Sequence, residues 1–411
     1  METNQNSTKT LGDPKQLVQQ TVFSILFTIS FTHFINDMLQ AVVPAVYPII
    51  KEKFHLSFTD IGLITLTYQL TASILQPFIG FYTDRKPRPY SLAIGMTFTL
   101  IGLMAVAVAS NFINILLAVS LIGIGSSIFH PESSRVAHLA SGGKKGLAQS
   151  IFQLGGNAGS AIGPLLAALI VVPYGQFYII WFCLAAVVGI IILSGIAKWY
   201  QEHLNLRALN KAVIKEDVHH NLSKKKVIFS LGILLVLIFS KYFYMASMTS
   251  YYTFYLIEKF NLTVQQSQIY LFAFMGAVAA GTLFGGPLGD RFGRKYIIWI
   301  SILGVAPFTL FLPYANLFWT GILSVIIGLI ISSAFSAILV YATELVPGKV
   351  GLIAGLFFGL AFGMGGLGSA VLGKLADSTS IEYVFKVCAF LPLIGILTSL
   401  LPNIEGKKKN K

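Results

Sequence analysis

Apolar runs long enough to cross a membrane recur along this chain, and they limit what it can fold into. A transmembrane helix needs roughly 20 predominantly apolar residues. Twelve segments meet this requirement, at about 21–50, 58–82, 90–110, 112–138, 147–172, 176–197, 227–257, 267–288, 296–315, 318–345, 350–373 and 381–402. Only 11% of the residues are charged, whereas soluble domains average about 25%. The sequence therefore predicts an all-α polytopic membrane protein with twelve transmembrane helices.

The basic residues predict how these helices are oriented. An even number of spans places both termini on one side, and that side holds 22 of the 29 lysine and arginine residues. The opposite loops hold five, while Arg135 and Lys241 lie within spans. Cytoplasmic loops of membrane proteins are enriched in Lys and Arg, so we expect both termini in the cytoplasm. The same rule accounts for the net charge of +13, and no nucleic-acid partner is expected.

The chain partly matches itself when it is shifted by 206 residues. Residues 52–57 (EKFHLS) correspond to residues 258–263 (EKFNLT), and Asp84-Arg85 corresponds to Asp290-Arg291. We therefore predict two six-helix halves in the same orientation. The predicted divisions are an N-terminal tail (1–20), a first half (21–199), a linker (200–225), a second half (226–402) and a basic C-terminal tail (403–411).

Two motifs resemble those of the major facilitator superfamily. The segment GPLGDRFGRK at 286–295 matches the loop signature G-x-x-x-D-R-x-G-R-[RK] throughout, and residues 80–89 match it less fully, because Pro87 and Pro89 replace a glycine and a basic residue. The Gly159-x-x-x-Gly163-Pro164 pattern resembles the core of the superfamily's antiporter motif. In that architecture two halves rock about a substrate site near the membrane midplane.

Longer stretches resemble bacterial exporters of the phosphonate antibiotic fosmidomycin within this superfamily. They include HFINDMLQ (33–40), QPFIGFYTD (76–84), FHPESSRVAHLASGG (129–143), GLAQSIFQLGGNAGS (146–160), FSKYFYMASMTSYYTFYL (239–256) and FGMGGLGSAVLG (362–373). The resemblance implies a multi-pass protein of the bacterial cytoplasmic (inner) membrane that exports a small anionic drug by proton antiport. We also expect a monomer surrounded by lipid, with no cofactor and no bound metal.

Acidic residues inside spans are the candidates for proton coupling. His33 and Asp37 are one helical turn apart and can share a face, and Glu132 lies in the unusual stretch IFHPESSR. Charges within a membrane are unfavourable and commonly mark proton or substrate pathways. We therefore expect Asp37, Glu132 and His33 to couple transport to protons; the alternative is a structural ion pair.

Basic and polar side chains in the spans are the candidates for binding the substrate. Arginine binds phosphonate oxygens through a fork of donors and lysine supplies a point charge. We expect Pro131 to bend its helix so that Glu132 and Arg135 face a cavity opposite Lys241; the alternative is an interfacial Glu132–Arg135 pair. The full set of candidate substrate-binding residues is Arg135, Lys241, Tyr244, Gln153, Asn157 and His130. The amides at 153 and 157 are equally compatible with joining helices.

The two loop signatures supply the candidates for gating. Their aspartates end spans two and eight beside basic residues, where they would clasp the halves together on the cytoplasmic face. The gating candidates are Asp84, Arg85, Arg88, Asp290, Arg291 and Arg294.

Other functions are less consistent with the sequence. The absence of a phosphate-binding G-x-x-x-x-G-K-[ST] loop argues against ATP-driven transport. Cys183 and Cys388 lie in apolar runs, which predicts buried thiols rather than a disulfide or a metal site. Two alternatives stay open: proton-coupled import of an organic anion, and a membrane enzyme that uses His130 and Glu132 as acid–base groups.

Overall fold

The computed structural model of the chain describes residues 21–56, 58–171, 173–209, 222–262 and 264–404. Within these ranges each of the twelve predicted spans corresponds to a helical segment. The helices of the first half are α2 (Phe23–Ala45), α3 (Tyr47–Phe54), α4 (Phe58–Arg85), α5 (Ser91–Val108), α6 (Phe112–Leu139), α7 (Lys145–Ile170), η1 (Gln176–Trp181) and α8 (Phe182–Leu209).

The second half is built in the same order, with more interruptions. Its helices are α9 (Lys224–Phe260), α10 (Val264–Phe292), α11 (Arg294–Ile302), α12 (Ala306–Phe311), η2 (Leu312–Tyr314), α13 (Leu317–Ser332), α14 (Ala334–Leu345), α15 (Val350–Ser378), α16 (Ile381–Cys388) and η3 (Leu391–Leu400). Prolines stand at the starts of α12 and η3, where a missing backbone N–H and a fixed φ are tolerated.

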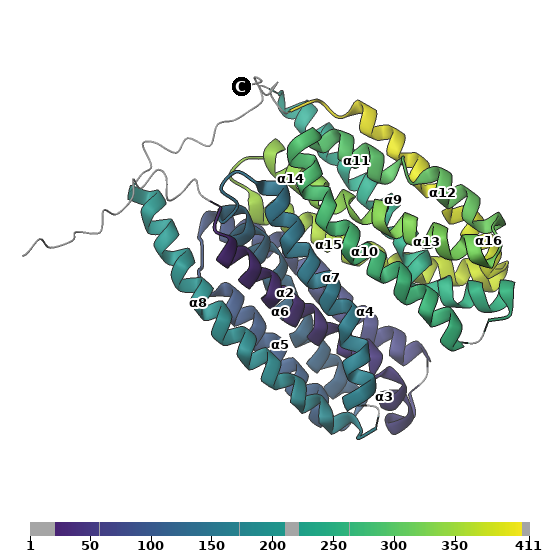
Figure 1. Ribbon diagram of the computed structural model, residues 1–411. Helices are drawn as coiled ribbons and strands as arrows, with labels where there is room; N and C mark the ends of the chain where they lie inside the picture. The colour runs from purple at the N-terminus through teal and green to yellow at the C-terminus, as the bar shows by residue number, and fades with distance from the viewer. Residues whose placement is uncertain (1–20, 57, 172, 210–221, 263, 405–411) are drawn as a thin grey trace, which may run out of the picture.

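The two halves lie side by side (Figure 1). The predicted linker is partly helical, since α8 continues to Leu209 and α9 begins at Lys224. The predicted N-terminal tail (1–20), residues 405–411 of the predicted C-terminal tail (403–411) and residues 210–221 of the linker lie outside the described residues. α6 runs without a break through Pro131.

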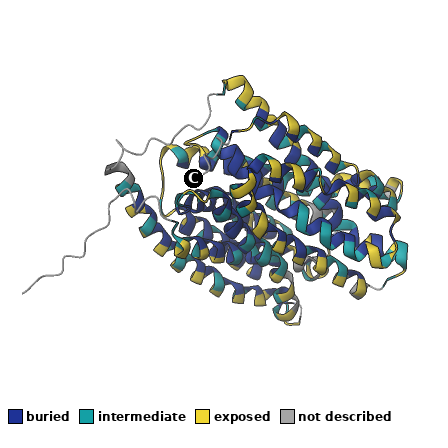
Figure 2. Cartoon of the chain, turned by 45° about the horizontal axis from the view of Figure 1, so that its top comes forward, coloured by how far each residue is buried: buried dark blue, intermediate teal, exposed yellow. Residues whose placement is uncertain are grey.

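The outer surface of the bundle, where the exposed residues gather (Figure 2), carries many large apolar side chains. Phe27, Phe78 and Leu169 are 60%, 68% and 70% exposed, which suits contact with lipid tails and not with water. Within the described residues, nine helical segments are long and apolar enough to cross a membrane. The other three spans contain α2, α4 and α7, which carry the polar side chains of the cavity described below. The chain is thus a multi-pass membrane protein.

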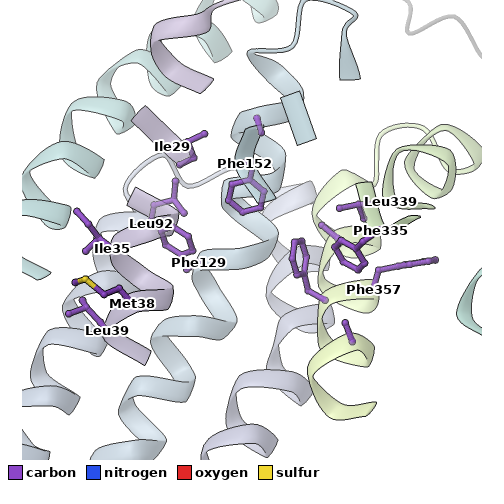
Figure 3. Packing of buried hydrophobic residues seen from close by; sticks show 14 of the residues in the cluster. Ile29, Ile35, Met38, Leu39, Leu92, Phe129, Phe152, Phe335, Leu339 and Phe357 are labelled. Carbon is purple, nitrogen blue, oxygen red and sulfur yellow. The ribbon is translucent and has the colours of Figure 1, made fainter. Parts of the chain in front are cut away.

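The halves meet chiefly along α4 with α15 and α7 with α10, and α6 also packs on α15. Glycines allow the close approach: a Cβ at Gly355 or Gly359 would overlap the backbone of α4, and one at Gly286 would overlap the carbonyl oxygen of Gly146. Small residues permit such backbone contact between membrane helices. Aromatic packing adds to this interface, where the ring centres of Phe152 in the first half and Phe358 in the second are 6.2 Å apart. Figure 3 shows Phe152 in the buried apolar cluster that also includes Phe335 and Phe357.

Candidate transport site

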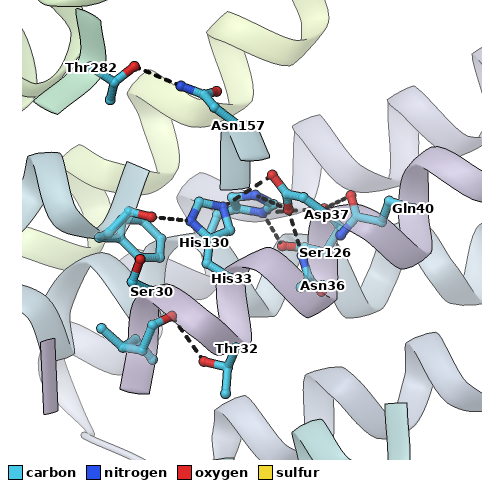
Figure 4. A network of polar contacts seen from close by, with 12 residues as sticks. Ser30, Thr32, His33, Asn36, Asp37, Gln40, Ser126, His130, Asn157 and Thr282 are labelled. Carbon is cyan, nitrogen blue, oxygen red and sulfur yellow. Dashed lines mark hydrogen bonds and ion pairs between the residues drawn. The ribbon is translucent and has the colours of Figure 1, made fainter. Parts of the chain in front are cut away.

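Two histidines hold one carboxylate in the interior of the first half. Asp37 Oδ2 lies 3.2 Å from His33 Nε2, and Asp37 Oδ1 lies 3.4 Å from His130 Nε2. His33 is on α2, one turn before Asp37, and His130 comes from α6 (Figure 4). The structure therefore confirms that His33 and Asp37 share a face, and it adds His130 as a third member of the cluster.

Backbone hydrogen bonds fix which ring nitrogens face the carboxylate. His33 Nδ1 lies 2.8 Å from the carbonyl oxygen of Phe152, and His130 Nδ1 lies 2.9 Å from that of Ser126. A carbonyl oxygen only accepts, so both Nδ1 atoms carry hydrogen and donate. Each Nε2 is then either a bare lone pair or the N–H of an imidazolium. In the imidazolium form each Nε2 N–H would donate to the Asp37 carboxylate.

Neutral polar groups extend this cluster toward a cavity. The Asn36 amide donates to Asp37 Oδ1 at 3.0 Å. Gln40 Oε1 accepts hydrogen bonds from Tyr68 of α4 and Ser126 of α6. Gln40, Tyr68 and Ser126 border a cavity of about 180 Å³, to which Asp37 contributes. A small polar molecule would therefore meet the carboxylate directly.

The cavity lies away from the end of the bundle at which α2 begins. Val22 donates to the carbonyl oxygen of Ala140, which places the start of α2 beside the end of α6. The cavity is lined by Ala41 and Pro44, near the other end of α2, and by Phe362 of α15. It thus lies between Asp37 and the far end of the bundle.

Aromatic rings pack on the histidines of this cluster. Phe358 and Phe362 of α15 lie 5.2 and 4.9 Å from the His130 ring, and Phe152 stacks on His33 at 4.0 Å between ring centres. Phe335 packs on Phe358 at 5.0 Å. The chain of ring contacts through Phe358 and Phe335 leads from the histidine cluster into the second half.

Lys241 lies behind this aromatic layer, in the second half. Its side chain is buried, with Nζ 3.5 Å from the carbonyl oxygen of Ser332 and 5.3 and 5.6 Å from the ring centres of Tyr242 and Phe335. No carboxylate of the described residues forms an ion pair with Lys241. A buried ammonium with one long carbonyl contact is poorly compensated, so this position suits an anionic ligand.

Arg135 does not lie where the sequence predicts. Its guanidinium pairs with Asp84 of α4, contacts the carbonyl oxygen of Thr83, and lies 3.6 Å from Glu132. Glu132 in turn accepts from Ser91 at 3.1 Å. The expectation that Arg135 and Glu132 face a cavity opposite Lys241 is therefore corrected for this structure, because both are engaged inside the first half.

The two signature aspartates bridge the halves. Asp84 accepts from the amides of Gly351 and Leu352, at 2.9 and 2.8 Å, where α15 begins. Asp290 accepts from the amides of Gly146 and Leu147, at 3.1 and 3.0 Å, where α7 begins. A helix N-terminus offers free N–H groups and a partial positive charge, so each carboxylate binds a helix of the other half. We call this end of the bundle the clasp end.

The remaining gating candidates differ in what they contact. Arg294 pairs with Asp290 at 3.0 Å and with Glu344 at 3.2 Å. The other three arginines are exposed and contact aromatic side chains of their own half. Arg85 lies over Phe81, Arg88 donates to Tyr82, and Arg291 lies over Phe292. Only Arg294 of these four therefore joins a clasp in this structure.

The other substrate-binding candidates are placed as follows. Asn157 donates to Thr282 of α10 at 2.8 Å, so it joins the two halves. Gln153 is buried one turn earlier on α7, and the buried Tyr244 hydroxyl has no hydrogen-bond partner within the described residues. The structure does not bring these three side chains into the cavity beside Asp37.

Some residues that contact the clasp were not predicted from the sequence. Glu344 and Lys145 form an ion pair of 3.8 Å across the halves, and Tyr200 lies 3.4 Å from Arg135. A signal existed for Glu344, a lone acid near the end of an apolar span. The aromatic layer of Phe335, Phe358 and Phe362 carried none, because phenylalanine is common throughout the chain.

Comparison with known proteins identifies the family of the chain. The model of the Major Facilitator Superfamily matches residues 29–267 and 233–411. The chain belongs to this superfamily, and it is a transporter of small molecules rather than an enzyme. Geometry agrees, since His130 contacts Asp37 whereas Glu132 contacts Arg135 and Ser91, so these two groups do not share one acid–base site.

Particular relatives are closely similar. The chain is 60% identical to the Fosmidomycin resistance protein of Escherichia coli K12, covering 94% of this chain and 95% of that one. It is 45% identical to an uncharacterized transporter of Bacillus subtilis, YfnC, covering 93% and 94%. The structure of the transporter FucP in its outward conformation is 16% identical, with a TM-score of 0.69 over 92% of this chain and 98% of that one, and supports the fold.

Proposed function

We propose that this chain exports small anionic drugs of the phosphonate class in exchange for protons, by alternating access across the bacterial cytoplasmic membrane. The buried His33–Asp37–His130 cluster beside an open cavity carries the proposal. The 60% identity to a protein named for fosmidomycin resistance supports the substrate class. The distribution of basic residues supports an orientation with the clasp end and both termini in the cytoplasm.

Asp37 and His33 are the proposed proton-coupling groups, with His130 added. The groups that face Asp37 are His130 from α6, Tyr68 of α4 through Gln40, and the apolar ring of Phe362 from α15. Protonation of the cluster would replace the contact between a histidine Nε2 lone pair and the Asp37 carboxylate by a hydrogen bond. Protons that enter from the cavity would therefore stabilise the cluster. Transport follows if the loaded and empty clusters prefer different arrangements of the halves.

Glu132 is also a proposed proton-coupling group, although it lies beside Arg135 and does not face the cavity. It lies fully buried on Arg135, next to the clasp and away from the cavity. A proton on Glu132 would weaken its hold on Arg135 and, through Arg135, the setting of Asp84. Its proposed role is therefore to link protonation to closure of the clasp end.

Lys241 is the proposed cation for the phosphonate, with Tyr244, Gln153, Asn157 and His130 along the path to it. Within the described residues Lys241 lacks a carboxylate partner, so an oxyanion would relieve an unfavourable burial. The aromatic layer of Phe335, Phe358 and Phe362 lies between Lys241 and the present cavity. We expect it to rearrange when the clasp end opens.

Transport by purified protein in liposomes tests the proposal. A pH gradient should drive fosmidomycin against its concentration gradient, and the sign of the gradient that works separates export from import. Asp37→Asn should abolish this uphill movement while leaving substrate exchange at equal pH. The matched control is Glu52→Gln, which removes an exposed acid of α3. Full pH-driven transport by Asp37→Asn would remove this cluster from the coupling mechanism.

A further inference from the structure

A second cavity lies between the halves at the clasp end. Its volume is about 10 Å³, which leaves room for roughly one water molecule. One wall is polar and belongs to the first half: Ser134 and His138 of α6 with Lys145 and Gln149 of α7. The facing wall belongs to the second half and includes Leu339. Separation of the halves at this end would therefore expose the polar wall.

The polar wall holds more hydrogen-bond donors than its present contacts use. Lys145 and Gln149 are one turn apart and share a face of α7. Gln149 Oε1 accepts from Ser134 Oγ at 3.1 Å, while Gln149 Nε2 is buried without a partner in the described part of the chain. Gln149 is only 5% exposed, and an unpaired buried donor is unfavourable. The amide N–H groups and the ammonium together suit an oxyanion.

In this structure Glu344 forms an ion pair with Lys145, the lysine of the polar wall. Its Oε1 lies 3.8 Å from Lys145 Nζ, and its Oε2 lies 3.2 Å from Arg294 Nη1. Lys145 belongs to the first half, whereas Glu344 and Arg294 belong to the second. When the halves separate, Glu344 keeps Arg294 but loses Lys145. The lysine is then available only in the open state.

We infer that Lys145 and Gln149, flanked by Ser134 and His138, form the site that first captures the anionic group of the cargo, a phosphonate or similar oxyanion. Glu344 replaces that oxyanion on Lys145 as the clasp end closes, which drives the cargo onward toward Lys241. The inference rests on the proposed function for the direction of movement. In this inference the Glu344 carboxylate competes with the substrate for Lys145.

The inference is tested by two variants that should change the half-saturating concentration of fosmidomycin in opposite directions. Initial rates of fosmidomycin uptake into inside-out vesicles give the half-saturating concentration. Lys145→Gln should raise it roughly tenfold, as expected when one charged hydrogen bond is lost, and Gln149→Leu should raise it by less. Glu344→Gln should lower it, because the competing carboxylate is gone. If Lys145 and Glu344 form only a latch, both changes would open the clasp end and shift the value in the same direction, which would overturn the inference.

Matched controls and a binding assay separate this test from that of the proposed function. Lys144→Gln, next to Lys145 in the chain, and Glu202→Gln on α8 are at exposed positions and should leave the half-saturating concentration unchanged. Binding of methylphosphonate to purified protein in phosphatidylcholine nanodiscs should weaken in Lys145→Gln even if no variant transports uphill. Absence of binding to the unmodified protein would overturn the inference. It would also be overturned if Lys145→Gln altered only the binding of phosphatidylglycerol, a result that would assign the site to lipid.

Discussion

Replacing Asp290 by asparagine should shift the transporter toward a state open at the clasp end. In the structure both carboxylate oxygens accept backbone amides of α7, from Gly146 and Leu147. An asparagine has one carbonyl oxygen, and its NH₂ group would face the second N–H donor. The substitution therefore removes one bond between the halves and the negative charge at the start of α7.

The size of this shift follows from the interactions lost. A hydrogen bond to a charged group contributes about 1.5–3 kcal/mol, and an anion at a helix N-terminus contributes about 0.3–1 kcal/mol. Arg294 retains Glu344, so no basic group is left unpaired. A loss of about 2–4 kcal/mol between the halves changes the closed-to-open ratio roughly 30- to 1,000-fold.

Labelling of single cysteines measures the shift. In a background in which Cys183 and Cys388 are replaced, a water-soluble maleimide should label Thr343→Cys, in the clasp-end cavity, at least tenfold faster when Asp290→Asn is present. Ser160 lines the cavity beside Asp37, and Ser160→Cys should be labelled more slowly. Glu258→Gln, an exposed acid near the end of α9, is the control. Unchanged rates at both reporter cysteines would refute the reasoning.

Three further predictions concern orientation, stability and packing. A cysteine at Ser223, exposed before α9, should react with an impermeant reagent only after cells are permeabilised. Arg135→Gln should lower the unfolding temperature, since it leaves Glu132 buried without its cation, an effect of about 3–5 kcal/mol; adding Glu132→Gln should restore part of it, and an unchanged temperature would contradict the ion pair. Gly286→Ala should open the clasp end, because its Cβ would overlap Gly146; normal closure by the labelling assay would disprove that contact.

Residue order along the chain was sufficient to predict the architecture. Apolar length determines how many helices cross a membrane, and the repeat of 206 residues determines that the halves share one orientation. The spacing of His33 and Asp37 was sufficient to predict their pairing, because residues four apart share a helix face wherever the helix lies. The signature aspartates likewise sit at helix ends whose positions follow from span length.

Partners on different helices were decided by the tertiary structure. His130 and Arg135 are five positions apart, which on a helix means about 140° of rotation and about 7.5 Å of rise. The packing of α6 against α2 takes His130 to Asp37, while its packing against α4 takes Arg135 to Asp84. Sequence spacing shows that the two side chains point in different directions, but not which neighbour lies in each. That depends on helix contacts between residues far apart in the chain, which is why Arg135 holds the clasp and does not face Lys241.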